Sequence, residues 1–169
     1  MTMRLYLMRH ADVALGKKES APELTSKGLE SLKRLLSHLD EKEFSELEEI
    51  RHSSMESAKE TARQFKKIGG LRAKVKEAPL LMPYDDFRIL ADIVATGTSN
   101  VMLVGHQPNL GMLASYLLAK ESRFNLIELK KTGMLCLEKA SVEKTQDAWT
   151  PDWKIRWLIN PRILKKKLC

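Results

Sequence analysis

Short apolar runs alternate with longer amphipathic stretches along most of this chain. Apolar runs of this length are typical of buried strands, and the amphipathic stretches are typical of helices that cross over between parallel strands. We therefore expect an α/β fold with a mostly parallel central sheet flanked by helices. The predicted strands are Leu5–Met8, Glu49–His52, Ala73–Glu77, Val101–Gly105, Met134–Glu138 and Ile155–Ile159.

Four stretches between these strands have the spacing of amphipathic helices. The first begins near Thr25, a residue type that often caps helices, and carries an apolar stripe from Leu29 to Leu39 at helical intervals. Gly69-Gly70 should end the second helix, because glycine is the common residue just beyond a helix. The other three predicted helices run from Met55 to Ile68, from Asp85 to Ala95 and from Pro108 to Ala119.

The alternation of helix and strand stops after residue 120. Two apolar runs there flank a polar loop, Ser141–Asp152, which predicts an antiparallel hairpin at the edge of the sheet and a mobile loop within it. No internal repeat, low-complexity tract or linker divides the sequence. A chain of 169 residues buries about 70 % of the surface that its unfolded form exposes, so we expect a single domain over residues 1–169 that needs no disulfide or metal.

The composition limits where the protein acts. The N-terminal sequence MTMRLYLMRH lacks the long apolar stretch of a signal peptide, and no segment approaches the roughly 20 apolar residues of a membrane span. We expect a cytoplasmic protein without membrane contacts. Cys136 and Cys169 form no CxxC pair and have no metal-ligand spacing, so we expect free thiols and no metal or other cofactor.

The formal net charge of +7 is concentrated near the C-terminus. This segment is either a solvated basic tail, which we favour, or a contact for an acidic macromolecular partner. The sequence contains no recognisable nucleic-acid-binding motif, so we expect no nucleic-acid binding. Residues 151–169 contain one acidic residue, Asp152, and six basic ones. The basic residues are Lys154, Arg156, Arg162, Lys165, Lys166 and Lys167.

Two of the predicted parallel strands run directly into histidines. Arg9 and His10 follow the first strand, and His106 follows Gly105. Ligands of open α/β sheets bind at the carboxyl ends of the strands, so we expect the two histidines to face each other across one crevice. A single histidine at a strand end is more often structural, but two beside an arginine fit phosphoryl transfer to a neutral imidazole, with cations holding the phosphoryl oxygens.

Three motifs, in this order and spacing, resemble the histidine phosphatase superfamily: LMRHA at Leu7–Ala11, LTSKG at Leu24–Gly28 and VGHQP at Val104–Pro108. Within that superfamily the chain is similar to the short SixA-type phosphohistidine phosphatases, which lack the inserted lid of the mutases. Lys131-Thr132-Gly133 and the closing WKIRWLINP at Trp153–Pro161 are also similar to this subgroup. The resemblance implies a phosphoglycerate mutase-like fold and a metal-independent phosphatase. Its substrate would be a phosphohistidine-bearing protein, and its product inorganic phosphate.

The resemblance also implies roles for the three residues at the strand ends. His10 would be the residue that is phosphorylated, Arg9 would bind the phosphoryl oxygens, and His106 would support the transferred group. A guanidinium suits this role because its planar fork reaches two oxygens. His10 should be neutral, with one ring nitrogen bound to an acceptor such as a backbone carbonyl, and His106 should have a raised pKa beside a bound dianion.

The chain departs from the family pattern at the start of the second helix. The family has SPxxRAxxT there, and the matching stretch Ser53–Thr61 places Ser57 at the position of a second phosphate-binding arginine. Losing one preorganised donor costs about 10²–10³ in rate unless another cation replaces it. Helix geometry turns Lys59 about 200° away from Ser57. The remaining candidates for a replacement are Arg51, Lys27 and Lys131.

A second departure concerns the proton donor. Superfamily members that act on phosphate esters often use a glutamate after the second helix, and Leu80–Pro83 offers none. An alkoxide leaving group depends on general acid catalysis, whereas imidazole departs more readily, so a phosphoramidate substrate is favoured over a sugar phosphate. Asp85 and Asp86 fit a turn that caps the next helix better than a catalytic role, although Asp85 stays a candidate. Asp12, two residues after His10, is a candidate for the pocket border.

Three functions remain open on these residues. The leading hypothesis is a phosphohistidine phosphatase that acts through a phospho-His10 intermediate. The alternative is a low-activity or inactive module that binds phosphate or a phosphoprotein, because Ser57 replaces the second arginine. A general phosphomonoesterase or mutase fits less well, since the chain lacks both the glutamate and a lid-sized insertion.

Overall fold

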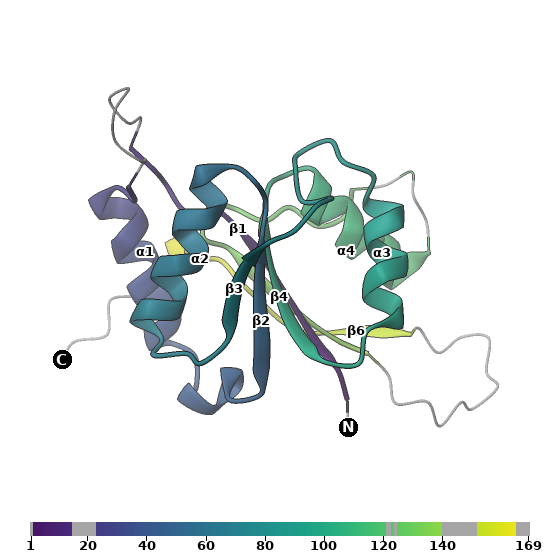
Figure 1. The fold of residues 1–169 in the computed structure, drawn as a ribbon, viewed down its shortest axis with the longest axis horizontal. Coiled ribbons are helices and arrows are strands. Elements are labelled where there is room, and N and C mark those ends of the chain that lie inside the picture. Colours follow the sequence, from purple (N-terminus) through teal and green to yellow (C-terminus); the bar gives the residue numbers. More distant parts are fainter. Residues whose placement is uncertain (1, 15–22, 121–122, 124, 140–151, 165–169) are drawn as a thin grey trace.

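A central sheet forms the middle layer of the molecule (Figure 1). The computed structural model describes residues 2–14, 23–120, 123, 125–139 and 152–164. The strands within these ranges are β1 (Arg4–Arg9), β2 (Leu47–His52), β3 (Lys74–Glu77), β4 (Asn100–Gly105), β5 (Met134–Lys139) and β6 (Trp153–Ile159). They form one six-stranded sheet in the order β3-β2-β4-β1-β5-β6.

The sheet is parallel on one side and antiparallel on the other. β3, β2, β4 and β1 pair in parallel, whereas β5 runs antiparallel to β1 and β6 runs antiparallel to β5. This topology confirms the predicted fold class, including the antiparallel hairpin at the edge. The segment that connects β5 to β6, residues 140–151, lies outside the described residues, so the prediction of a mobile loop stays a prediction.

Every predicted helix is present, with small shifts at the ends. Thr25 caps the first helix as predicted, because its side chain accepts a hydrogen bond from the backbone of Gly28. The third helix begins later than predicted, since Asp86 is its N-cap. Two short 3₁₀ helices, η1 (Glu41–Phe44) and η2 (Pro161–Ile163), were not predicted. The α-helices are α1 (Ser26–Ser37), α2 (Glu56–Ile68), α3 (Phe87–Thr96) and α4 (Asn109–Ala119).

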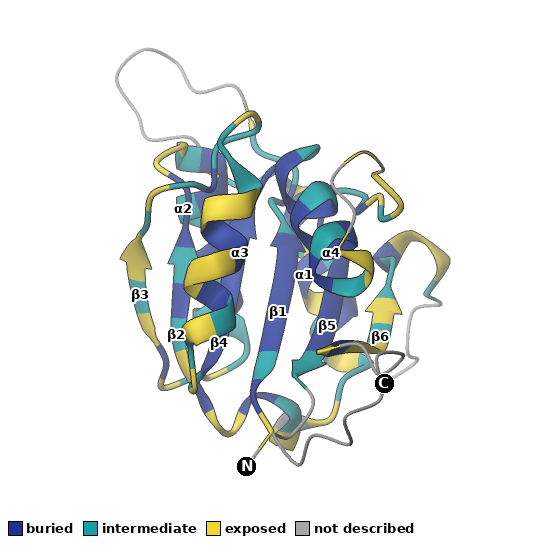
Figure 2. Cartoon of the chain, turned by 90° about the vertical axis from the view of Figure 1, so that its right-hand side faces the viewer, coloured by how far each residue is buried: buried dark blue, intermediate teal, exposed yellow. Residues whose placement is uncertain are grey.

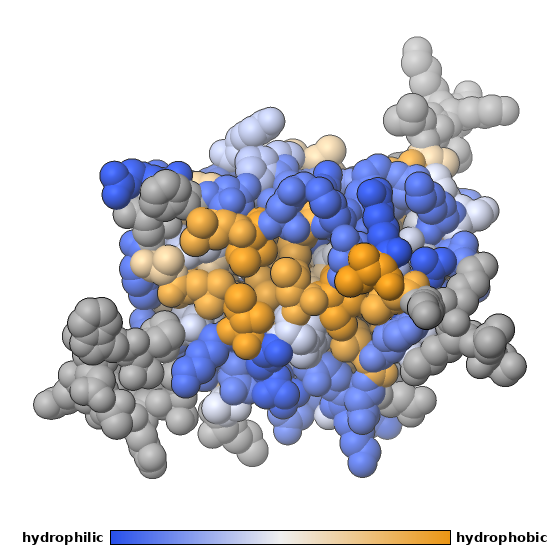
Figure 3. Space-filling model, turned by 180° about the vertical axis from the view of Figure 1, so that it is seen from behind, coloured by the Kyte–Doolittle hydropathy of each residue, from blue (hydrophilic) through white to orange (hydrophobic). Residues whose placement is uncertain are grey.

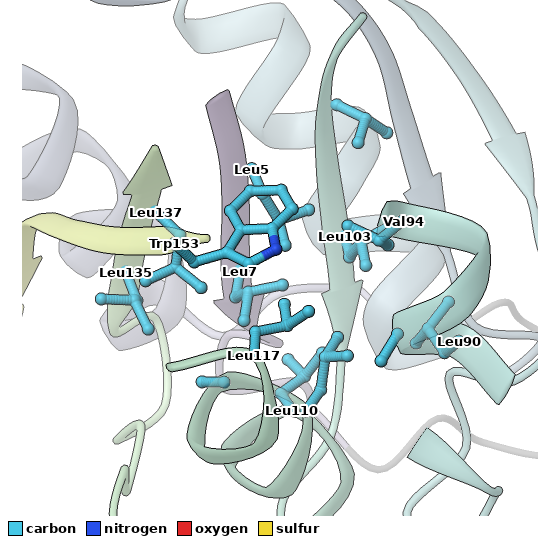
Figure 4. Close-up of a cluster of buried hydrophobic side chains, with 14 of the residues drawn as sticks. Leu5, Leu7, Leu90, Val94, Leu103, Leu110, Leu117, Leu135, Leu137 and Trp153 are labelled. Carbon is cyan, nitrogen blue, oxygen red and sulfur yellow. The ribbon is translucent and has the colours of Figure 1, made fainter. Parts of the chain in front are cut away.

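The helices cover the two faces of the sheet in pairs (Figure 1). α3 and α4 pack on one face, where leucines of both helices meet apolar side chains of β1, β4 and β5 (Figure 4). α1 and α2 pack on the opposite face against the alternate side chains of the same strands. Burial on both faces explains why β1 and β4 are continuous apolar runs. The side chains of the α3 and α4 face that Figure 4 labels are Leu5, Leu7, Leu90, Val94, Leu103, Leu110, Leu117, Leu135, Leu137 and Trp153.

Burial decreases from the middle of the sheet to its edges (Figure 2). All residues of β4 are buried, whereas the outer strands β3 and β6 are largely exposed. The exposed large hydrophobic residues include Ile155 and Leu158 on β6.

On the side turned away from the viewer in Figure 1, apolar side chains gather in a band bordered by hydrophilic ones (Figure 3). Within the described part of the chain, no helix is long and apolar enough to cross a membrane.

Candidate active site

His10 and His106 lie together at the carboxyl ends of β1 and β4. These strands are parallel neighbours with Arg9 opposite Gly105, so the residue that follows each strand emerges at the same edge of the sheet. The backbone N–H of His10 donates to the carbonyl of Gly105 at 3.0 Å, which fixes the two strand ends together. The imidazole centroids are 4.9 Å apart, with 50° between the ring planes. The two rings therefore share one site.

The ring of His10 is held in one orientation by the adjacent backbone. Its Nδ1 lies 2.8 Å from the carbonyl oxygen of Ala11. A carbonyl only accepts hydrogen bonds, so Nδ1 carries the proton and Nε2 keeps its lone pair. Burial lowers the pKa of His10, and the positive charges of Arg9 and Lys131 lower it further, against the opposing effect of the Ala11 carbonyl. The ring is consequently neutral near pH 7 and presents a free nitrogen.

His106 is more deeply buried and is held by a serine. Only 4 % of the residue is exposed, and its Nε2 lies 2.7 Å from the hydroxyl oxygen of Ser53. Burial, with smaller contributions from His10 and Arg9, lowers the pKa of His106 to about 4. The sequence predicts a raised pKa of His106 for a site that holds a dianion. Without a dianion, the protein alone shifts the pKa of His106 in the opposite direction.

Ser53 was not singled out from the sequence as a site residue. It directly follows β2, and its backbone N–H donates to the carbonyl of Val104 at 3.1 Å, so that its hydroxyl lies beside His106. The available signal was its position directly after a predicted strand, but β2 is mostly polar, unlike the apolar runs before His10 and His106. The contact with His106 could be found only with the knowledge that β2 and β4 are neighbours.

Thr61 connects α2 to the loop that carries His10. Its hydroxyl accepts a hydrogen bond from the backbone N–H of Ala11 at 2.9 Å and donates to the carbonyl of Ser57 at 2.6 Å. Ser57 is buried in the first turn of α2, one helical turn before Thr61. The position that the family pattern assigns to an arginine is thus linked through Thr61 to the loop after β1, but it carries no charge here.

Two lysines and one arginine were candidates to replace the missing cation. Arg51 is paired with Glu49 at 2.8 Å and lines a different pocket, together with Asn100 and Val101. Lys27 and Lys131 line the same pocket as Arg9. Lys59, which helix geometry excluded, forms an ion pair with Glu56 at 2.8 Å. The geometry leaves the two lysines.

Lys131 is fastened to the strand end that carries Arg9 and His10. In the loop before β5, the backbone N–H of Thr132 donates to the carbonyls of Arg9 and His10 at 3.1 and 3.3 Å, and the N–H of Arg9 donates to Gly133 at 3.1 Å. The ammonium of Lys131 forms an ion pair with Asp12. Lys131 also contributes to the lowered pKa of His10, so its charge acts on that imidazole.

Arg9 contacts the backbone that leads into this loop. Its Nη1 donates to the carbonyl of Leu129 at 3.1 Å. Its Nε is buried and has no hydrogen-bond partner among the described residues. Arg9 therefore keeps donor capacity that no described residue uses.

The two candidate aspartates differ in position. Asp12 borders the pocket of Arg9, and its pKa is lowered mainly by the hydrogen bond from Lys131. Asp85 does not line that pocket. Its carboxylate accepts a hydrogen bond from the backbone of Met82 at 2.8 Å, and its carbonyl accepts one from Asn109 at 2.9 Å. The contacts of Asp85 are those of a turn residue before α3. In the described part of the chain, no group of three or more His, Cys, Asp or Glu side chains is placed to hold a metal.

Comparisons with known proteins give matches among solved structures. No protein-family model matches the sequence, and a search of curated proteins gives no match. The protein histidine phosphatase SixA complexed with tungstate matches with a TM-score of 0.72 and 19 % identity, over 95 % of this chain and 98 % of that one. A putative phosphohistidine phosphatase SixA from Agrobacterium tumefaciens matches with a TM-score of 0.67 and 16 % identity, over 94 % and 98 % of the two chains.

A third match comes from a phosphatase with a different name. A putative alpha-ribazole-5'-P phosphatase from Escherichia coli str. K-12 has a TM-score of 0.67 and 16 % identity, over 94 % of this chain and 97 % of that one. Identities this low establish a shared fold, and the matches extend over nearly the whole length of each chain. The resemblance seen in the three sequence motifs is therefore confirmed at the level of structure: this chain has the fold of the histidine phosphatase superfamily, which includes the SixA phosphohistidine phosphatases.

Proposed function

We propose that the protein is a phosphatase that removes phosphate from phosphohistidine on a signalling or phosphotransfer protein, through a phospho-His10 intermediate. One observation carries this proposal. The His10 ring has its Nδ1 bound to the Ala11 carbonyl and a lowered pKa, so that a neutral Nε2 is presented beside His106 and Arg9. This is the state in which an imidazole acts as a nucleophile.

The reaction proceeds in two displacements at phosphorus. The lone pair of His10 Nε2 attacks the phosphoryl group of a phosphohistidine whose other ring nitrogen carries a proton. The P–N bond of the substrate breaks, and the substrate imidazole leaves with the bonding electrons as a neutral ring. Positive charge develops on the His10 ring and is stabilised by the Ala11 carbonyl that accepts from Nδ1. Water then attacks phospho-His10, and the second P–N bond breaks to give inorganic phosphate and free His10.

Cations around His10 stabilise the phosphoryl oxygens during both steps. Arg9 offers its planar fork, and in the proposed reaction Lys131 supplies the charge that Ser57 lacks. The support for Lys131 is its fixed position in the loop bonded to Arg9 and His10, and its effect on the pKa of His10. His106 lines the site opposite His10 and is proposed to donate to the transferred group once a dianion raises its pKa.

The leaving group favours phosphohistidine over a phosphate ester. Leu80–Pro83 contains no carboxylic acid, and the carboxylate of Asp85 already accepts a backbone hydrogen bond. An imidazole leaves without the strong general acid catalysis that an alkoxide needs. Two of the three structural matches described above are named as SixA proteins, which agrees with this substrate class.

The uncharged Ser57 favours a second candidate function. With one family cation missing, the site would bind a phosphorylated partner and turn it over slowly or not at all. The two functions differ in what His10→Ala does. The enzyme loses hydrolysis and the phosphoenzyme together, whereas the binding module loses little beyond some affinity for phosphate.

The test uses a phosphotransfer domain that carries labelled phosphohistidine. Phosphate release and acid-labile label on the purified protein are followed together, with His10→Ala as the test variant and His38→Ala, which removes a histidine at the end of α1, as the control. Release that is lost only in His10→Ala supports the phosphatase. Stable binding without release supports the binding module, and rapid turnover of a simple phosphate ester supports a general phosphomonoesterase.

A further inference from the structure

A basic pocket adjoins the candidate active site. It has a volume of about 740 Å³ and is lined by α1, by the loop before β5 and by η2. Two carboxylates, Asp12 and Glu30, face six cationic side chains in its wall. The cationic residues are Arg9, Lys27, Arg34, Lys130, Lys131 and Arg162.

Ion pairs among the residues that the structure describes neutralise only part of this charge. Asp12 pairs with Lys131, Glu30 pairs with Arg34 at 2.9 Å, and Lys130 pairs with Glu128 at 2.5 Å. Among the described residues, Lys27 and Arg162 form no ion pair. The pocket therefore carries an excess of positive charge, which favours an anionic ligand.

The pocket and the phosphoryl site share Arg9. Its guanidinium lines the pocket, while the next residue in the chain is the nucleophile His10. Thr132 also lines the pocket, and its backbone N–H donates to the carbonyl of His10 at 3.3 Å. A ligand whose phosphoryl group is at His10 consequently has its neighbouring groups at the pocket.

The spread of the cations indicates the kind of anion. Lys27, Ser31 and Arg34 follow one another on one face of α1, and the seven residue steps from Lys27 to Arg34 span about 10 Å along the helix. η2 adds Arg162 from across the pocket and is attached to α1 by a 3.5 Å hydrogen bond from Arg34 to the Pro161 carbonyl. Charges distributed over this length match several carboxylates on a protein surface better than they match one compact phosphate.

We propose that this basic pocket docks acidic side chains that surround the phosphohistidine of the substrate protein. The inference rests on the proposed function, because it places a phosphohistidine at His10. The pocket would then select protein substrates by charge, while the residues around His10 act on the phosphoryl group. Complementary charges of this kind raise association rates and become less effective as salt increases.

The experiment compares a protein substrate with a small one. The protein substrate is a phosphotransfer domain with Asp and Glu around its phosphohistidine, and the small one is phosphoramidate. Arg162→Glu and, separately, Ser31→Glu place a negative charge in the pocket wall. Lys33→Glu is the matched control, because Lys33 is exposed on α1 outside the pocket and its replacement changes the net charge by the same amount as Arg162→Glu.

We expect both pocket variants to raise the KM for the protein substrate about tenfold at low salt, because like charges then face each other across the interface. Turnover of phosphoramidate should stay within about twofold of the unmodified protein, and Lys33→Glu should change neither substrate. An unchanged KM for the protein substrate would overturn the proposal, as would an equal effect of Lys33→Glu. The proposal would also be overturned if the pocket variants changed nothing except inhibition by pyrophosphate. The pocket would then be assigned to a small polyanion.

A binding measurement separates this inference from the proposed function. The affinity of His10→Ala for the same phosphorylated domain is measured with and without Arg162→Glu. If the protein hydrolyses neither substrate but Arg162→Glu weakens binding, the docking pocket stands and the phosphatase fails. If hydrolysis depends on His10 but binding is insensitive to Arg162→Glu, the phosphatase stands and the docking pocket fails.

Discussion

At the scale of single residues, the chain distributes its positive charge differently from the pattern that it resembles. Ser57 is neutral in the first turn of α2, and Lys131 approaches from the other side of β1, in the loop bonded to Arg9 and His10. Lysine is a point charge and does not offer the fork of an arginine. In the proposed reaction, Lys131 therefore supplies electrostatic stabilisation without bidentate geometry.

Lys131→Met should therefore lower kcat/KM for phosphoramidate by about 10²-fold, because one preorganised cation is removed from the site. The same substitution should raise the pKa of His10 toward its ordinary value, since Lys131 contributes to lowering it. Steady-state kinetics measure the first effect, and an NMR titration of the imidazole measures the second. Lys131→Arg should keep most of the activity. An unchanged rate together with an unchanged His10 pKa would show that Asp12 neutralises Lys131 in solution.

Residues of the site differed in how far the sequence could predict them. Arg9, His10 and His106 follow apolar strands directly, so their meeting at one sheet edge was predictable from the pattern. Ser53 also follows a strand, but its contact with His106 depends on β2 lying next to β4. The position of Lys131 depends on a long-range contact between loops that carry no periodic signal.

At the scale of elements, α1 is seated against the loop that follows β1. Gly28 lies in the first turn of α1, and a Cβ at this position would overlap the carbonyl oxygen of Asp12. That carbonyl already accepts a hydrogen bond from the backbone of Thr25 at 3.0 Å, so it is not free to move away. The glycine of the LTSKG motif thus permits the close approach of helix and loop.

Gly28→Ala should lower the free energy of unfolding by about 1–3 kcal/mol, because the added methyl forces α1 away from Asp12. In an open helix the same substitution would stabilise by about 1 kcal/mol, so the sign of the effect is diagnostic. Urea unfolding measures it, with Lys33→Ala on the exposed side of α1 as the control that should be near neutral. Stabilisation by Gly28→Ala would mean that α1 does not contact the loop this closely.

The elements themselves were largely predictable, and their ends and order were not. Apolar runs and helical stripes reveal strands and helices because burial imposes their periodicity. The hairpin of β5 and β6 was predicted from two runs without a helix between them. η1 and η2 are too short for a period to show, and Asp85 belongs to the turn rather than to α3 because its carboxylate bonds to Met82. The strand order depends on contacts between segments distant in the sequence.

At the scale of the whole molecule, burying His106 makes the stability of the fold depend on pH. His106 is held neutral in the folded protein with a pKa of about 4, whereas an unfolded chain has the ordinary value of 6.5. As the pH falls from 7 to 4, the unfolded state takes up a proton that the folded state does not bind. Protonation therefore favours unfolding, and the contribution of His106 is fully present only above pH 6.5.

The free energy of unfolding should fall by about 3 kcal/mol between pH 7 and pH 4 on account of His106. His10, whose pKa is also lowered, adds a decrease in the same direction. His106→Asn removes the titrating group and should flatten the pH dependence, while His38→Asn at the end of α1 should leave it as steep as in the unmodified protein. Urea unfolding at pH 7, 6, 5 and 4 gives both slopes. If His106→Asn were to lose as much stability between pH 7 and pH 4 as the unmodified protein, His106 would be protonated in the folded state. The neutral, buried state of His106 would then not describe the site without ligand.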